Sequence, residues 1–400
     1  MPGVDHAEGP RSSCRWPGLL GGGLILLLAL VCVSSLAPHL SLPPQPTPTP
    51  PPPTPTSWPR ARLVSPEYGM QAFLWWREEV ADRDLGLIED AGFTWVKQNV
   101  GWRALEGIER GSFDWWFTDR IVNQAEAHNL DILFRLDGIP LPDWVEPTGD
   151  PSLPVHPEAF AHFCSEMGNR YRDRVRAYQI WNEPNLGREW DGHPPSPGGY
   201  VELLRACYIA IKQADPQALV ISAGLAPTGT GPPNAMPDME YLLAMYEAGA
   251  APYFDLLGLN APGYGAPPEM SPRAAASAPE YGGQRFFCFR HVEDAREIML
   301  RFGDGGKQVA ILEMGWTTDP SNPEYAWFAV TEEQKADYLV RAFAYARENW
   351  QPWIGPMFVL SIANPFWTPD EEQYWWAVTE PGWPRTNARL SYYALVDMDK

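Results

Sequence analysis

Two patterns of apolar and polar positions alternate between residue 66 and residue 400. Short runs of apolar residues, typical of buried strands, are each followed by a longer segment whose apolar residues recur at helical spacing. The predicted strands are residues 68–74, 94–100, 131–136, 177–181, 218–223, 254–259, 308–313 and 356–361. The predicted helices are residues 79–91, 116–129, 157–172, 199–214, 238–248, 292–301, 331–349 and 386–396.

Eight strands that alternate with eight helices over about 340 residues predict an α/β fold, the (β/α)8 or TIM barrel. A doubly wound open sheet shows the same alternation. That competing fold often carries a glycine-rich nucleotide-binding turn after its first strand, and no such turn follows residues 68–74. We therefore expect a single barrel domain over residues 61–400.

The first 60 residues have a different pattern, which predicts a leader and a linker. Arg11 and Arg15 precede residues 18–37, which carry no charge and are rich in leucine. This pattern is typical of a secretion leader or of a single membrane-spanning anchor. Residues 1–37 are therefore interpreted as a short cytoplasmic tail with a signal anchor or signal peptide. Residues 38–59 contain 11 prolines in 22 positions, so an extended, semi-rigid linker is expected over 38–60.

The linker favours an uncleaved anchor over a cleaved leader. A stiff spacer is useful when its front end stays in the membrane and holds a domain away from the surface. Cleavage near Val33-Ser34-Ser35 is the alternative. Both interpretations place the barrel domain outside the cytoplasm, with the membrane contacted only through the N-terminal segment.

Charge and composition narrow the class of partner. The chain has a net charge of −20. The first 60 residues have a net charge of +1, so residues 61–400 have a net charge of −21. So acidic a domain is not expected to bind nucleic acid or anionic lipid. The 19 tryptophans provide flat, partly polar faces that suit the C–H faces of sugar rings, although many are expected to fill the core.

The cysteines do not predict a metal site. No CxxC motif or Cys/His cluster occurs, so neither a structural zinc ion nor another metal is expected. Cys164 and Cys207 fall on consecutive predicted helices. Buried free thiols are the default interpretation, and a disulfide in an oxidising compartment is the alternative.

Two acidic residues stand at the ends of predicted strands. In a barrel, catalytic groups lie at the C-terminal ends of the strands and in the loops that follow. The stretch QIWNEPN ends the fourth strand and contains Glu183, and the seventh strand ends at Glu313. Both carboxylates are therefore expected at the same mouth of the barrel. Pro184 disfavours the α region for the residue before it, so an extended backbone is expected at Glu183.

A pair of carboxylates across a cleft is the apparatus that cleaves a glycosidic bond. One carboxylate attacks the anomeric carbon while the other, still protonated, gives its proton to the departing oxygen. Mutual repulsion and different neighbours must therefore separate the two pKa values. The sequence predicts this chemistry for Glu183 and Glu313.

The chain also resembles the retaining glycoside hydrolases of clan A, most closely families 39 and 5. The resemblance rests on Asn182-Glu183-Pro184 at strand four and on Leu312-Glu313-Met314-Gly315-Trp316 at strand seven, and it covers most of residues 66–400. It implies that Glu183 is the acid/base, that Glu313 is the nucleophile and that no cofactor is needed.

The resemblance also suggests residues that bind the sugar. Asn182 matches the residue that contacts the 2-hydroxyl, Tyr264 the residue beside the nucleophile, and Trp367 a tryptophan that stacks on sugar. From their positions near the ends of strands two, three and seven, we add further candidates for the substrate site, namely Asn99, Arg135, Asp137 and Trp316.

The sequence thus predicts an extracytoplasmic retaining β-glycosidase that acts on a polysaccharide or oligosaccharide. A transglycosylase on the same fold is one alternative, and a catalytically silent carbohydrate-binding surface protein is another. The sugar, the linkage, endo or exo action and the oligomeric state are not determined by the sequence, because loops set specificity on this fold.

Overall fold

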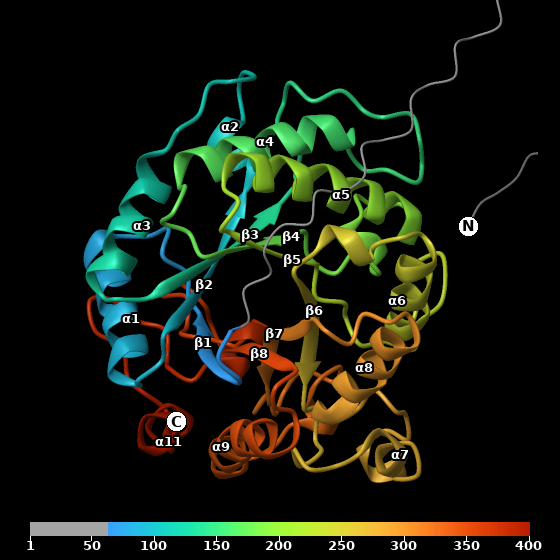
Figure 1. Ribbon diagram of the computed structural model, residues 1–400. Coiled ribbons are helices and arrows are strands. Elements are labelled where there is room, and N and C mark those ends of the chain that lie inside the picture. Colours follow the sequence, from blue (N-terminus) through green and yellow to red (C-terminus); the bar gives the residue numbers. More distant parts are fainter. Residues whose placement is uncertain (1–62) are drawn as a thin grey trace, which may run out of the picture. The chain divides into compact units, whose positions relative to one another are not determined.

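The computed structural model describes residues 63–400, which form a closed barrel of eight parallel strands inside a ring of helices (Figure 1). Each strand pairs with the next along the chain, and β1 pairs with β8 to close the barrel. The strands are β1 (Glu67–Gln71), β2 (Trp95–Gly101), β3 (Asp131–Asp137), β4 (Ala177–Ile180), β5 (Leu219–Ile221), β6 (Leu256–Pro262), β7 (Gln308–Gly315) and β8 (Ile354–Val359). The predicted barrel is confirmed.

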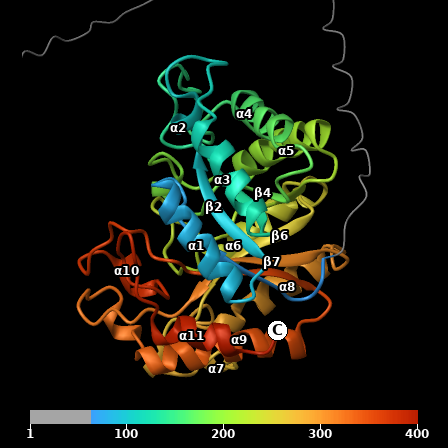
Figure 2. The ribbon, with the colours of Figure 1, turned by 90° about the vertical axis from the view of Figure 1, so that its left-hand side faces the viewer.

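Helices follow the strands in the predicted order and cover the outside of the barrel. The covering helices are α1 (Glu78–Asp90), α3 (Trp116–Ala127), α4 (Pro157–Arg170), α5 (Pro197–Ala214), α6 (Asp238–Glu247), α8 (Val292–Arg301), α9 (Glu332–Asn349) and α11 (Leu390–Asp397). Three short helices that the pattern did not predict lie in the connections, namely α2 (Trp102–Glu106), α7 (Pro272–Ala275) and α10 (Glu372–Trp376). Figure 2 shows α10 at the left, beside the barrel.

The strands are apolar on both faces because both faces are buried. Side chains that point into the barrel form a central cluster in which Trp95 and Phe358 are the largest. Side chains that point outward pack against the helices in a larger cluster, which includes Val96 and Ile132 from the strands and Ile88 and Phe343 from the helices.

Among the predicted boundaries that differ from the structure are those of β7 and of the last helix. Strand β7 continues to Gly315, so Glu313 lies inside the strand and not at its last position. The last helix was expected from residue 386 but begins at Leu390. Its first predicted turn is instead extended, because Thr379 and Ala388 form an isolated antiparallel bridge.

Cys164 on α4 and Cys207 on α5 form a disulfide, with their Cα atoms 5.5 Å apart. The default interpretation of two free thiols is therefore wrong. The sequence left this open because pairing requires the two helices to lie side by side at the right height, and α4 and α5 do so. Cys288 is a buried free thiol.

The predicted leader and linker lie outside the described residues. Over residues 63–400, no helix is both long enough and apolar enough to cross a membrane.

Candidate active site

A cavity of about 660 Å³ opens at the C-terminal ends of the strands. It contains both Glu183 and Glu313, so the structure brings together the two carboxylates that the sequence singled out. The other polar residues that line it are Gln71, Asn99, Arg135, Arg188, Thr228, Asn260, Ser361, Glu371, Glu372 and Gln373. Its aromatic lining consists of Phe73, Tyr264, Tyr325, Phe328, Trp367 and Trp376.

The chain turns sharply after β4 and thereby places Glu183 in the cavity. Trp181 has a φ of 73° and Glu183 a φ of 36°, both in the left-handed region that non-glycine residues rarely adopt. The expected extended backbone at Glu183 is therefore wrong. Pro184 disfavours the right-handed helical region for its neighbour, but the left-handed region was still accessible.

Tertiary contacts hold this turn in its uncommon conformation. The indole of Trp181 donates to the carbonyl of Glu189 over 2.8 Å. Its ring lies where a Cβ at position 138 would be only 2.0 Å away, so this close approach requires Gly138. The buried amide of Asn185 donates to the carbonyls of Ala226 and Met236, which fixes the other side of the turn. A strained backbone that is held by so many contacts is typical of a functional site.

Glu183 lies in surroundings that favour its protonated form. The side chain is largely buried, with 16% exposed, and Oε1 accepts a hydrogen bond from Nδ2 of Asn260 over 2.9 Å. Burial and, after it, the negative charge of Glu313 raise the pKa of Glu183 to about 7. Two contacts act in the opposite direction and lower this pKa, namely the positive charge of Arg188, 3.5 Å from Oε2, and the hydrogen bond from Asn260.

Asn260 links the two carboxylates. It stands on β6 directly beside Glu313 in the register of β6 and β7, while its side chain reaches Glu183. Gly224 leaves room for that side chain, because a Cβ at this position would lie 2.2 Å from Oδ1 of Asn260.

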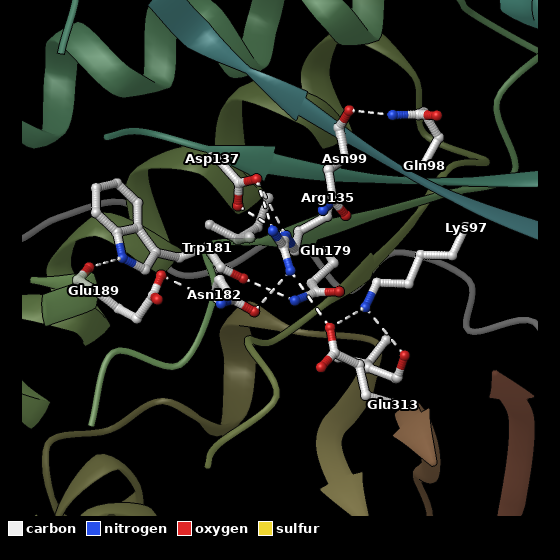
Figure 3. A network of polar contacts seen from close by, with 12 residues as sticks. Lys97, Gln98, Asn99, Arg135, Asp137, Gln179, Trp181, Asn182, Glu189 and Glu313 are labelled. Carbon is white, nitrogen blue, oxygen red and sulfur yellow. Dashed lines mark hydrogen bonds and ion pairs between the residues drawn. The ribbon is translucent and has the colours of Figure 1, made fainter. Parts of the chain in front are cut away.

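Glu313 lies in surroundings that favour its ionised form (Figure 3). Oε1 accepts a hydrogen bond from the fully buried Nζ of Lys97 over 2.9 Å and lies 3.4 Å from the guanidinium of Arg135. Burial alone would raise the pKa of Glu313, but the positive charges of Lys97 and Arg135 outweigh it and hold the pKa below its ordinary value. At neutral pH, Glu313 is therefore charged.

A polar network from β3 and from the loop after β4 supports these groups (Figure 3). Arg135 is paired with Asp137, with Nε and Oδ1 2.9 Å apart, and it donates to Oδ1 of Asn182 over 2.9 Å. Nδ2 of Asn182 donates to Glu189 over 3.2 Å. The amides and carboxylates thus orient Arg135 toward Glu313.

The remaining sequence candidates fall into two groups. One group lines the cavity and consists of Asn99, Arg135, Tyr264 and Trp367. The other group is not part of the cavity lining and consists of Asn182, Asp137 and Trp316. Asn182 and Asp137 instead hold Arg135.

The placement of Trp316 as a sugar-binding residue is wrong. Its side chain is fully buried, its Nε1 donates to the carbonyl of Ala266, and its ring packs over Gly263. The side chain at the end of a strand points either outward under the loops or into the mouth, and the sequence did not distinguish the two.

Three residues belong to the site although the sequence did not single them out, namely Lys97, Asn260 and Gln71. A signal existed for Lys97, because a charged residue inside a buried strand requires a partner, and it lies two positions before Asn99, on the same face of the strand. Asn260 gave no comparable signal. Among residues 63–400, no group of His, Cys, Asp and Glu side chains is arranged to hold a metal ion.

Comparisons with known proteins agree with this geometry at the level of the fold. No family model matches the chain, and no curated protein matches its sequence. Among solved structures, a family 39 glycoside hydrolase from Bacteroides cellulosilyticus WH2 is similar with a TM-score of 0.59 and 18% identity, over 83% of this chain and 63% of that one. The present chain thus spans less than two thirds of that enzyme's length.

Two further solved structures are matched over nearly their whole lengths. A beta-glycosidase is similar with a TM-score of 0.57 and 15% identity, over 85% of this chain and 96% of that one. A GH10 endoxylanase from a sugarcane soil metagenome is similar with a TM-score of 0.54 and 13% identity, over 83% of this chain and 97% of that one. The chain has the fold of these glycoside hydrolases.

Proposed function

We propose that this protein is a retaining β-glycosidase that hydrolyses O-glycosidic bonds of a polysaccharide or oligosaccharide, with Glu313 as nucleophile and Glu183 as acid/base. One observation carries the proposal. Two glutamates in one cavity have pKa values displaced in opposite directions, so that one is charged and the other can still hold a proton near neutral pH. The glycoside hydrolases that share the fold support it.

In the first step, a carboxylate oxygen of Glu313 attacks the anomeric carbon. The contacts from Lys97 and Arg135 both fall on Oε1, which leaves Oε2 to form the new bond. The bond from the anomeric carbon to the leaving oxygen breaks, and Glu183 gives its proton to that oxygen. The products are an alcohol and a glycosyl ester on Glu313.

In the second step, the oxygen of a water molecule attacks the anomeric carbon and displaces the carboxylate of Glu313. Esterification removes the negative charge of Glu313, and that charge had raised the pKa of Glu183. The pKa of Glu183 therefore falls, and its carboxylate takes a proton from the attacking water. The ester bond breaks, Glu313 becomes ionised again, and the sugar leaves with its original anomeric configuration.

The cavity offers hydrogen-bond acceptors for sugar hydroxyls. Oε1 of Gln71 and Oδ1 of Asn99 are buried and have no hydrogen-bond partner among residues 63–400. Buried acceptors without partners are rare and costly, so we assign them to hydroxyl groups of the bound sugar. Trp367 provides an apolar ring surface in the same cavity.

We place this activity outside the cytoplasm. The disulfide between Cys164 and Cys207 supports an oxidising compartment, and the apolar segment before the proline-rich linker supports export. An uncleaved membrane anchor is our proposal for that segment.

The test is a screen of the full chain on neutral polysaccharides and aryl glycosides. We expect at least one substrate to be cleaved, with NMR of the first product showing the β anomer before mutarotation. Sugar-to-sugar transfer products at high substrate concentration would instead favour the transglycosylase. An inverted first product would contradict the assigned roles, and inactivity on the whole panel would favour a binding protein.

The pH dependence should be bell-shaped, with its maximum on the acidic side of neutrality. Activity should fall as the pH rises through about 7, because Glu183 then loses the proton that it donates. It should also fall as the pH drops below the ordinary range of a glutamate, where Glu313 becomes protonated. The measurement is kcat/KM against pH on the substrate that the screen identifies.

Arg188→Gln should move only the basic limb, and upward. Arg188 lowers the pKa of Glu183, so its removal raises that pKa. Because the Arg188 side chain is 73% exposed and screened by water, the shift should be less than about one pH unit. Arg188→Lys keeps the charge and should leave the limb in place. A downward shift in Arg188→Gln would contradict the role of Glu183 as the proton donor.

A further inference from the structure

Four aromatic side chains from two loops gather at one side of the cavity. The loop between β1 and α1 contributes Phe73 and Trp76, and the loop between β8 and α10 contributes Phe366 and Trp367. The rings of Phe73 and Trp367 meet edge to face with centroids 4.8 Å apart, and those of Trp76 and Phe366 do the same at 4.7 Å. The two loops thus form two aromatic pairs.

The inner pair belongs to the cavity, and the outer pair lies on the surface. Phe73 and Trp367 line the cavity. Trp76 is 41% exposed and Phe366 is 67% exposed, so neither is explained by core packing. Exposed apolar side chains that form a patch mark a binding site more often than isolated ones do. Figure 2 shows the beginning of α1 and α10 on the same side of the barrel.

The backbone beneath the outer pair is fixed by hydrogen bonds. The guanidinium of Arg120 on α3 donates to the carbonyls of Leu74 and Trp76 over 2.7 and 3.0 Å. In the other loop, the amide of Phe366 donates to Oδ1 of Asn364 over 3.0 Å. Surfaces that are held in place before binding lose less entropy when a ligand arrives.

We propose that Trp76 and Phe366 form a second sugar-binding platform, which continues the catalytic cavity and binds the same neutral polysaccharide chain. The inference rests on the proposed function. We infer a glycan because the outer pair stands on the same two loops as Phe73 and Trp367, which line the cavity of the two carboxylates. It is uncharged or nearly so, because residues 61–400 carry a charge of −21, which repels polyanions.

The position of the platform in the barrel gives the direction in which the polysaccharide chain is bound. Strands β1 and β8 are neighbours, and β4, which carries Glu183, lies across the barrel from them. Glu183 protonates the leaving group, so the leaving group lies toward β4. The platform therefore binds sugars on the non-reducing side of the scissile bond. A substrate must extend beyond the sugar in the cavity to use it, so activity should increase with chain length.

The test compares long and short substrates in the full chain. Trp76→Ala/Phe366→Ala should lower kcat/KM on a hexasaccharide of the cleaved polymer about tenfold, because two apolar ring faces no longer bury against the sugar. Activity on an aryl monoglycoside, which ends within the cavity, should stay within about twofold of wild type. Tyr393→Ala on α11 is the matched control, because it also removes an exposed aromatic ring (55%). Helix α11 contacts α1 near Leu87, away from Trp76, so this substitution should leave activity on both substrates unchanged.

A binding measurement separates this proposal from the proposed function. In the Glu313→Ala background, we expect the double substitution to weaken the retention of β-1,4-glucan, xylan or mannan in affinity electrophoresis about tenfold. Platform-dependent binding without hydrolysis by wild type would overturn the proposed function and support the platform. Three outcomes would overturn the platform. The double substitution could lower kcat/KM equally on the short and the long substrate, or it could leave kcat/KM unchanged on both. The Glu313→Ala protein could also fail to bind any of the three polymers.

Discussion

Replacing Glu313 with alanine is expected to reduce hydrolysis by at least about 10⁴-fold, because the carboxylate that forms the glycosyl ester is removed. The truncation leaves a space next to the anomeric carbon and removes the negative charge that raises the pKa of Glu183. Lys97 and Arg135 then have no carboxylate between them. The measurement is kcat on an aryl glycoside and on the natural polymer.

Chemical rescue shows whether the loss is that of the nucleophile. Azide that enters the space left by Glu313→Ala should restore turnover of an activated aryl glycoside and give a glycosyl azide of inverted configuration. Glu183→Ala is the matched variant, and it should retain kcat/KM on substrates whose leaving group needs no proton, because kcat/KM reports the first step, while losing about 10²–10⁴-fold on the polymer. A rescued product of retained configuration from Glu313→Ala would mean that the two roles are reversed.

Replacing Lys97 with methionine is expected to lower kcat/KM at neutral pH roughly 10²-fold and to move the acidic limb of the pH profile upward. Nζ of Lys97 donates to Oε1 of Glu313 and, over 3.0 Å, to the carbonyl of Leu312, and the side chain is fully buried. Its positive charge is the larger of the two that lower the pKa of Glu313. Without it that pKa rises, so protonation of the nucleophile begins at a higher pH.

The shift of the limb distinguishes a positioning role from a structural one. Lys212→Met on α5 is the control, because it also removes a fully buried ammonium, in this case the partner of Asp255. It should destabilise the fold and leave the acidic limb of the remaining active protein where it was. If Lys97→Met lost activity without any movement of the limb, Lys97 would not set the ionisation of Glu313.

Much of the fold was predictable because its signals are local. Each buried strand of a parallel barrel is apolar on both faces, and each covering helix has one apolar face, so the alternation is visible along the chain. The same alternation placed Glu183 and Glu313 at one mouth, since the C-terminal ends of all eight strands meet there. For these two residues, the order of the strands was sufficient.

What the sequence by itself determined, then, is the barrel and the choice of the two carboxylates, while their chemical state was decided by the tertiary structure. Lys97 lies 216 positions before Glu313, and Asn260 lies 77 positions after Glu183, so the contacts that separate the two pKa values exist only in the closed barrel. Burial itself is also a property of the assembled cavity. The left-handed turn at Glu183, the burial of Trp316 under the loops and the pairing of Cys164 with Cys207 depend in the same way on neighbours from other elements. The pattern along a chain reports which residues are buried, but an electrostatic field or a strained turn depends on groups that only folding brings within a few ångströms.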